Sequence, residues 1–135
     1  MDYWLLKTEP GSYSVDDLAR EGKTVWDGVT NPAALKNLRA MGSGDRILVY
    51  HSGAERAVVG LAKVAGRAYP DPKAGDPKLV VIDIRFVGRL PRPVTLGEIK
   101  AEKVFTGSIL LRQGRLSVVP LTEEQWSKVL VLAGV

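Results

Sequence analysis

Six consecutive residues, Trp26 to Asn31, carry the side chains best suited to binding chemistry. They read Trp-Asp-Gly-Val-Thr-Asn and are followed by Pro32. An asparagine accepts hydrogen bonds from the free N–H groups at a helix start, and a proline in the first turn has no N–H to leave unpaired. Gly28 lets the backbone bend or approach a ligand closely. The stretch therefore predicts a small polar pocket with an aromatic wall at a helix N-terminus, the alternative being a core tryptophan beside an ordinary turn.

His51 is the single histidine of the chain and prompts an enzyme hypothesis. It lies between Tyr50 and Ser52 on a predicted strand, where adjacent side chains point to opposite faces. His51 and Ser52 therefore do not form a base–nucleophile pair, and a catalytic partner must come from elsewhere. Asp27 and Glu9 are the candidates for that partner. A histidine that makes only structural or ligand hydrogen bonds is the alternative.

The composition excludes several classes of site. The 135 residues are the size of one domain, which we expect to span 1–135. The absence of cysteine removes disulfides, iron–sulfur clusters and thiolate zinc sites, and one histidine argues against zinc, so we expect neither a metal nor another cofactor. There is no signal-peptide pattern and no apolar run long enough for a membrane span, which predicts a soluble, intracellular, cytoplasmic protein. A net charge of +4, spread along the chain, permits nucleic-acid contact without requiring it.

The pattern of apolar residues, turns and capping signals predicts an α+β fold. Short buried strands are expected at 3–7, 46–52, 57–64, 79–87, 108–112 and 116–119. Short helices are expected to begin at Ser14, Asn31, Thr95 and Thr122, with Tyr13 as the apolar staple before the first of them. The proline-rich stretch 66–78 is expected to form a surface loop. Such short strands with interspersed helices indicate a small curved sheet or barrel decorated by helices.

An ordered set of motifs, each weak alone, runs through nearly the whole chain, from residue 3 to about residue 132. They are YWLLKTEP at 3–10, VWDGV at 25–29, GD at 44–45, YHS at 50–52, YPDP at 69–72, RPVTL at 92–96 and LRQGRLSV at 111–118. The set resembles the EVE domain family of the PUA-like superfamily. The resemblance implies a single EVE domain with a PUA-like β-barrel of about five to six mostly antiparallel strands, flanked by short helices. It also implies a pocket for one nucleobase, akin to that of YTH and ASCH domains, in a family linked to modified cytosine in DNA.

With that resemblance, the candidate residues take roles around a base. Trp26 is expected to stack on the base, with Tyr50 as a second aromatic wall, while Trp4 and Trp126 belong to the core. The expected base-pocket residues are Thr8, Trp26, Asp27, Gly28, Asn31, Tyr50, His51 and Ser52. Of these, Thr8, Asp27, Asn31 and Ser52 are the polar groups expected at the edge of the base. The expected contacts to phosphates at the rim are Lys7, Arg112 and Arg115.

Three functions remain open on the sequence. The first is a non-catalytic reader of a modified nucleobase, a 5-modified cytosine or a similar base, in DNA or RNA. The second is an enzyme that acts on a nucleotide or small base-like ligand through Asp27 or His51 as the acid–base group. The third is a protein-interaction module. It is kept because family members often continue after the VWDGV motif with Arg-Asn-Tyr-Gln-Ala-Arg-Asn, whereas this chain reads Thr-Asn-Pro-Ala-Ala-Leu-Lys-Asn from Thr30 to Asn37 and lacks the arginine and the tyrosine.

Overall fold

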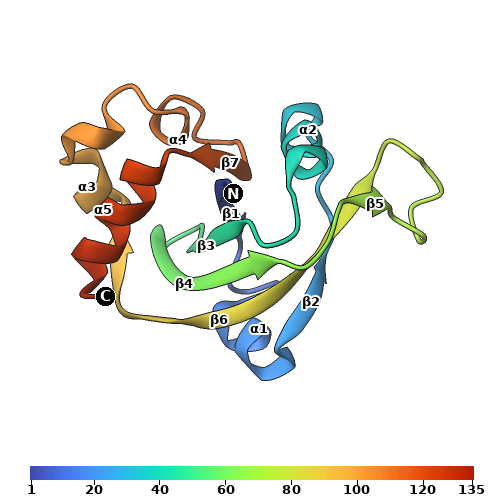
Figure 1. Cartoon of the computed structure of the whole chain (residues 1–135), viewed down its shortest axis with the longest axis horizontal. Helices are drawn as coiled ribbons and strands as arrows, with labels where there is room; N and C mark the ends of the chain where they lie inside the picture. The colour runs from blue at the N-terminus through green and yellow to red at the C-terminus, as the bar shows by residue number, and fades with distance from the viewer.

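The structure, a computed structural model, describes residues 1–135 and consists of one curved sheet with short helices around it (Figure 1). The strands are β1 (Tyr3–Thr8), β2 (Lys23–Trp26), β3 (Arg46–His51), β4 (Ala57–Val64), β5 (Tyr69–Pro70), β6 (Val80–Thr95) and β7 (Val118–Leu121). The helices are α1 (Val15–Glu21), α2 (Pro32–Ala40), α3 (Leu96–Lys100), α4 (Ile109–Arg112) and α5 (Glu123–Ala133), with a 3-10 turn at Lys103–Phe105. None of these helices is both long enough and apolar enough to cross a membrane.

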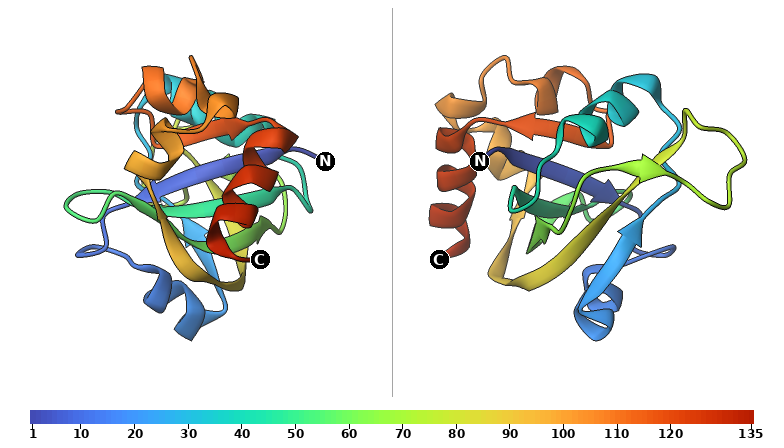
Figure 2. Two further views of the ribbon diagram at one scale, coloured as in Figure 1. Left: turned by 90° about the vertical axis from the view of Figure 1, so that its left-hand side faces the viewer. Right: turned by 45° about the vertical axis from the view of Figure 1, so that its right-hand side comes forward.

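The sheet is mixed and open. Its strand order is β2-β6-β4-β3-β1-β7, with β5 paired to β6, and every pairing is antiparallel except that of β1 with β3. The 16-residue strand β6 crosses the whole molecule and pairs with β2, β4 and β5, and its pairing with β4 contains two register shifts that help it to curve (Figure 2). The expected α+β class is confirmed. The sheet has one strand more than the expected five to six and curves like a barrel without closing, because β2 and β7 remain as free edges.

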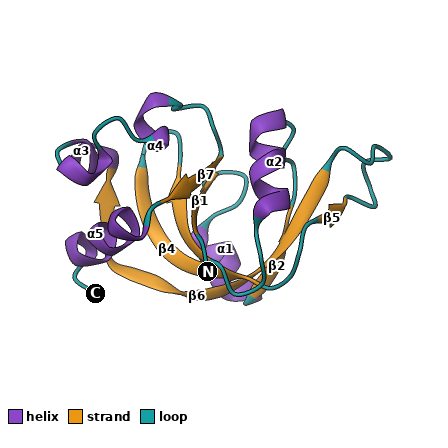
Figure 3. Ribbon diagram, turned by 45° about the horizontal axis from the view of Figure 1, so that its top comes forward, coloured by secondary structure: helices purple, strands orange, loops and turns teal.

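Helices cover the sheet in two groups. Figure 3 shows α3, α4 and α5 gathered at one end, with α2 separate from them at the other end. In β3 every residue after Arg46 is buried, since both faces of this central strand are covered. Trp4 and Trp126 are 5% and 6% exposed, which confirms both as core residues. The apolar core is therefore built around the middle strands, and the free edge at β2 lies away from the larger helix group.

The short helices begin where the capping signals predicted. Ser14, Thr95 and Thr122 each form a full capping box with the residue three positions later, and Asn31 accepts from the N–H groups of Ala33 and Ala34. Each such cap satisfies N–H groups that the first turn of a helix leaves without an intrahelical partner. The positions of these helix starts are thus encoded locally.

Four secondary-structure predictions were wrong or incomplete. The expected strand at 108–112 is helix α4, since the Ser108 hydroxyl caps the N–H of Leu111 and a short apolar run fits either structure. The strand expected at 79–87 continues to Thr95, and the predicted loop 66–78 contains the two-residue strand β5. Strand β2 was not predicted, because only one of its four residues is buried.

Helix α1 is held closely against the sheet, which fixes the turn that precedes it. A Cβ atom added at Gly60 of β4 would lie 2.6 Å from Cγ2 of Val15, so only a glycine allows this approach. On the outer side, the Arg89 guanidinium of β6 donates two hydrogen bonds to one carboxylate oxygen of Asp16, at 2.9 and 3.1 Å. The packing of α1 on the sheet therefore fixes the position of the residues before it.

Candidate functional site

A cavity of about 700 Å³ opens between the end of β1 and the outer edge of β2. Three segments distant in sequence form its walls: the end of β1 with the turn before α1, β2 with the loop to α2, and the segment before β7. Its lining residues are Lys7, Thr8, Glu9, Ser12, Tyr13, Thr24, Val25, Trp26, Asp27, Gly28, Val29, Thr30, Asn31, Arg115 and Ser117. All six residues of the predicted stretch, from Trp26 to Asn31, thus line the cavity.

The loop from β2 to α2 is shaped by its own sequence. Gly28 has a φ of 76°, a left-handed conformation that side chains disfavour. The Asn31 carbonyl oxygen Oδ1 accepts from the N–H groups of Ala33 and Ala34 at 2.9 and 3.1 Å, which fixes the start of α2. The amide nitrogen of Asn31 has no partner in the chain and remains a free donor on the cavity wall. In the Asn31 side chain, Oδ1 therefore acts as the predicted helix cap, and the amide nitrogen is the polar group available to a ligand.

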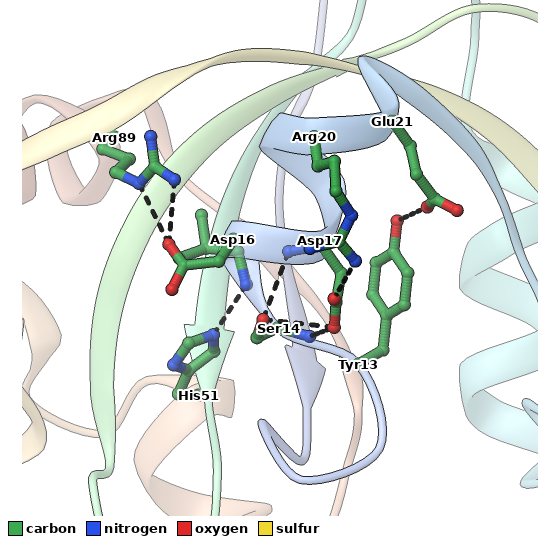
Figure 4. A network of polar contacts seen from close by, with 9 residues as sticks. Tyr13, Ser14, Asp16, Asp17, Arg20, Glu21, His51 and Arg89 are labelled. Atoms are coloured by element: carbon green, nitrogen blue, oxygen red, sulfur yellow. Dashed lines mark hydrogen bonds and ion pairs between the residues drawn. The ribbon is translucent and has the colours of Figure 1, made fainter.

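The aromatic wall consists of Trp26 and Tyr13. Their rings meet edge to face with centroids 6.0 Å apart, and the Tyr13 hydroxyl donates to the carboxylate of Glu21 in α1 (Figure 4). Burial, and then the Glu21 hydrogen bond, raise the pKa of Tyr13 to about 12, so its hydroxyl stays protonated at neutral pH. Tyr13 was predicted only as a helix staple, and its place opposite Trp26 depends on how α1 docks on the sheet.

Trp26 is more enclosed than a one-sided stacking residue would be, with 7% of its surface exposed. Its indole N–H donates no hydrogen bond within the chain, and the structure contains no fully enclosed side-chain N or O atom without a partner. The small exposed part of Trp26 therefore includes this N–H group. Tyr13, which is half-buried, offers the larger open ring surface.

The polar groups of the cavity differ in how they are engaged. Asp27 is exposed and takes part in none of the ion pairs of the chain. The Thr8 hydroxyl, by contrast, donates to the Tyr13 carbonyl at 2.8 Å and so holds the turn before α1. Glu9 lies at the rim and accepts weakly from the Gly11 N–H at 3.3 Å. Asp27 is therefore the acceptor that is free to meet a ligand.

Two cationic side chains line the cavity. Lys7 donates from Nζ to the Gly114 carbonyl at 2.8 Å and lies 5.6 Å from the ring centroid of Tyr50. Its partial burial lowers the pKa of Lys7 below the ordinary lysine value. Arg115, one residue beyond the carbonyl that Lys7 holds, is exposed and makes no ion pair. Arg112 lies at the end of α4 and is not among the lining residues.

The structure does not bring Tyr50, His51 and Ser52 into the cavity. Tyr50 is 4% exposed, beneath Lys7, and the Ser52 backbone N–H donates to the Thr8 carbonyl. Tyr50 and His51 end β3 and Ser52 follows it, and β4 and β6 lie between β3 and the β2 edge in the sheet. Their contact with Thr8 therefore serves the packing of the sheet and not the cavity.

His51 is fully engaged beneath α1. Its Nε2 accepts from the Val15 N–H at 3.0 Å (Figure 4), and its Nδ1 faces the Glu55 carboxylate at 2.7 Å. Because Nε2 accepts, the proton of the neutral ring lies on Nδ1, and both nitrogens are occupied. His51 is therefore paired with neither Asp27 nor Glu9, the two candidate catalytic partners. No three His, Cys, Asp or Glu side chains lie close enough together to hold a metal ion.

Comparisons with known proteins agree on one family. The EVE domain model matches residues 2–132. Thymocyte nuclear protein 1 of Rattus norvegicus is 35% identical over 97% of this chain and 73% of its own length. A protein of Agrobacterium tumefaciens superposes with a TM-score of 0.96 at 38% identity, covering 100% of this chain and 94% of its own. The human THYN1 protein, in a complex with DNA that contains 5-methylcytosine, superposes with a TM-score of 0.87 at 32% identity, covering 98% of both chains. The predicted PUA-like fold is confirmed.

Proposed function

The chain belongs to the EVE domain family, and we propose that it is a non-catalytic nucleic-acid-binding domain whose cavity holds one modified nucleobase. The base proposed is a 5-modified cytosine or a similar base, carried by DNA or RNA. The observation that carries the proposal is the aromatic and polar cavity, present in a chain of which 98% superposes on human THYN1, a protein solved with 5-methylcytosine DNA. A cavity of about 700 Å³ is ample for a base together with part of its sugar and phosphate.

Each open group of the cavity has a role in this function. Stacking of a base on an aromatic side chain is worth about 1–3 kcal/mol, and Tyr13 presents the more open ring. The Asp27 carboxylate accepts from an exocyclic amine such as that of cytosine, and the Asn31 amide nitrogen donates to a ring nitrogen or a carbonyl. Arg115 pairs with a backbone phosphate at the rim.

A base enters such a cavity only from a single strand or after it has turned out of a duplex. Flipping costs a few kcal/mol and is easiest at weakened pairs. We therefore expect single-stranded and mismatched sites to bind best. The engagement of both His51 nitrogens favours a binding role over catalysis through that residue. The single-domain extent and the cytoplasmic location stay predictions.

The test is a titration of the protein with single-stranded oligonucleotides that differ only in one cytosine, methylated at C5 or not. The proposal expects tighter binding of the methylated strand at moderate salt and a loss of affinity as salt rises, because phosphate contacts release counterions. Equal affinity for the two strands would overturn base reading. Arg115→Gln should weaken both strands equally and flatten the salt dependence. Arg112→Gln removes the same charge outside the cavity and serves as its control.

A further inference from the structure

The outer edge of β2 is itself a wall of the cavity. β2 is the terminal strand of the sheet, so its outer edge has no partner strand. Three successive residues of β2, Thr24, Val25 and Trp26, all line the cavity. Successive side chains of a strand point to opposite faces, so three in a row cannot line a space with side chains from one face alone. The main chain at the strand edge must therefore contribute to the wall.

The pairing register shows which main-chain groups face outward. The Phe86 N–H donates to the Gly22 carbonyl at 2.8 Å, and the register pairs Thr24 with Ile84 and Trp26 with Ile82. In an antiparallel ladder the hydrogen-bonded positions alternate, so Gly22, Thr24 and Trp26 turn their main chain toward β6. The positions between them, Lys23 and Val25, turn their N–H and C=O groups to the outer edge.

A second contact supports this alternation. The Asp83 carbonyl, opposite Val25 in the register, accepts from the Ala65 N–H at 2.9 Å and so points away from β2. The N–H and C=O of Val25 are thus left without a partner strand, and Val25 lines the cavity whereas Lys23 does not. Val25 is 47% exposed, so its position is open to solvent.

The chemistry of the Val25 N–H and C=O and of the side chains beside them indicates which ligand they bind. One strand residue turned outward offers an N–H donor and a C=O acceptor next to each other, in fixed positions. A nucleobase carries a ring nitrogen beside an exocyclic amino or carbonyl group, which is the matching pair. Tyr13 and Trp26 supply the aromatic surface beside this edge, and Arg115 supplies positive charge at the rim.

We propose that the Val25 main chain hydrogen-bonds the Watson–Crick edge of the bound base, its N–H donating and its C=O accepting. This inference rests on the proposed function and assigns a specificity-determining element of the same cavity. The contact is made by backbone, so it survives side-chain substitution at this position. It also orients the base, since the plane of the base must match the plane of the strand edge.

Amide hydrogen exchange tests the inference directly. In the free protein the Val25 N–H has no acceptor and should exchange much faster than the Trp26 N–H, which faces β6. At saturation with a single-stranded oligonucleotide carrying one 5-methylcytosine, exchange at Val25 should slow about tenfold or more. Lys23, on the same edge but outside the cavity, is the internal control and should not change.

The outcomes separate this inference from the proposed function. If the oligonucleotide does not bind, the proposed function fails. If it binds and exchange at Val25 is unchanged, or if Val25 is already as protected as Trp26 in the free protein, only the inference fails. Protection of Lys23 and Val25 together would indicate pairing with a peptide strand along the whole edge, and would also overturn it.

A substitution provides a second readout. Val25→Pro removes the N–H without breaking a bond to β6, and proline is tolerated on an edge strand when its missing N–H faces outward. Binding of the methylated strand should weaken about tenfold, while Val25→Ala, which keeps the N–H, should bind within about twofold of the wild type. Equal affinity of the two variants would contradict the inference, and the exchange measurement decides if Val25→Pro fails to fold.

Discussion

Trp4 and Trp26 are nearly equally buried, yet the polar groups at Trp4 are hydrogen-bonded within the chain and those at Trp26 are not. The Trp4 indole N–H donates to Oδ2 of Asp45 at 3.0 Å. The same carboxylate accepts from the backbone N–H groups of Gly42 at 2.9 Å and Asp2 at 3.1 Å. Burial alone would raise the pKa of Asp45, but these donors outweigh it and lower the pKa. The Trp4 indole N–H and both carboxylate oxygens of Asp45 therefore have partners inside the chain.

Around Trp26 the partners are missing. Its indole N–H, the Asp27 carboxylate, the Asn31 amide nitrogen and the outward groups of Val25 have none within the chain, and all four residues line one cavity. A buried polar group costs free energy unless it is hydrogen-bonded, so a fold leaves such groups open only where water or a ligand reaches them. Hydrogen bonding of the surrounding polar groups, more than burial, therefore separates a structural tryptophan from one at a binding site.

The largest effect is expected from Trp4→Ala, which should lower the free energy of unfolding by about 3–5 kcal/mol. The substitution leaves a cavity in the core and removes one donor from the buried Asp45 carboxylate. Chemical denaturation measures the loss. Binding of oligonucleotides by the fraction that stays folded should be unchanged, and a specific loss of binding would break the comparison.

Trp26→Ala should also destabilise the fold, because 7% exposure leaves most of the ring in the core, but by about 3 kcal/mol, at the low end of the usual range for a large buried aromatic. Its ring borders the cavity and its N–H has no partner to lose. This variant should in addition lose binding. Destabilisation greater than that of Trp4→Ala, with normal binding, would make Trp26 a purely structural residue.

Asp45→Asn should lower the free energy of unfolding by about 1.5–3 kcal/mol at neutral pH, since three hydrogen bonds to a carboxylate become weaker or are lost. The pKa of Asp45 is lowered in the folded state, so its contribution is full above the unfolded-state pKa of about 3.9 and is lost as pH falls through the lower folded value. The stability difference between wild type and variant should therefore shrink below about pH 4. A difference that grows on acidification would contradict the assignment.

Tyr13→Ala should weaken binding of a methylated oligonucleotide by about 1–3 kcal/mol through lost stacking. The ring is half-buried, so the effect on stability should be smaller than for either tryptophan. Tyr69→Ala removes an exposed tyrosine of β5 outside the cavity and is the matched control. Equal binding by both variants would mean that Tyr13 does not stack on the base.

The smallest effect on stability is expected from Asp27→Ala, within about 0.5 kcal/mol, because this exposed carboxylate has no partner in the chain. Binding of a cytosine-containing strand should nevertheless fall by about 1.5–3 kcal/mol if the carboxylate accepts from the exocyclic amine. Glu124→Ala removes the same charge at the start of α5, outside the cavity, and should leave binding unchanged. A loss of stability without a loss of binding would make Asp27 a turn residue.

The features predicted correctly from the sequence are those that depend on residues close together in the chain. Capping at Ser14, Asn31, Thr95 and Thr122 depends on residues within one turn, and the structure has all four helix starts. The stretch from Trp26 to Asn31 lines the cavity for the same reason, since Gly28 and the Asn31 cap shape it from within.

The features that the sequence did not predict depend on the order of the strands and on how the helices pack on the sheet. Tyr50 lies opposite Lys7 in the β1–β3 register, but the Lys7 side chain covers its ring, and nothing in the spacing reveals which of the two reaches the cavity. Tyr13 reaches Trp26 only because α1 packs closely on Gly60, a contact between residues far apart in the chain. The β2 edge was missed because an exposed four-residue strand has almost no apolar pattern.

The central claim is that the cavity beside β2 binds a modified nucleobase, and backbone NMR shift mapping tests it most directly. On titration with a single-stranded oligonucleotide carrying one 5-methylcytosine, the largest amide shifts should fall at residues 7–13, 24–31 and 115–117. Asp2, Trp4 and Asp45 should be unmoved, as expected for a region whose polar groups are already paired. Shifts centred away from the cavity, or equal shifts with an unmethylated strand of the same sequence, would contradict the claim.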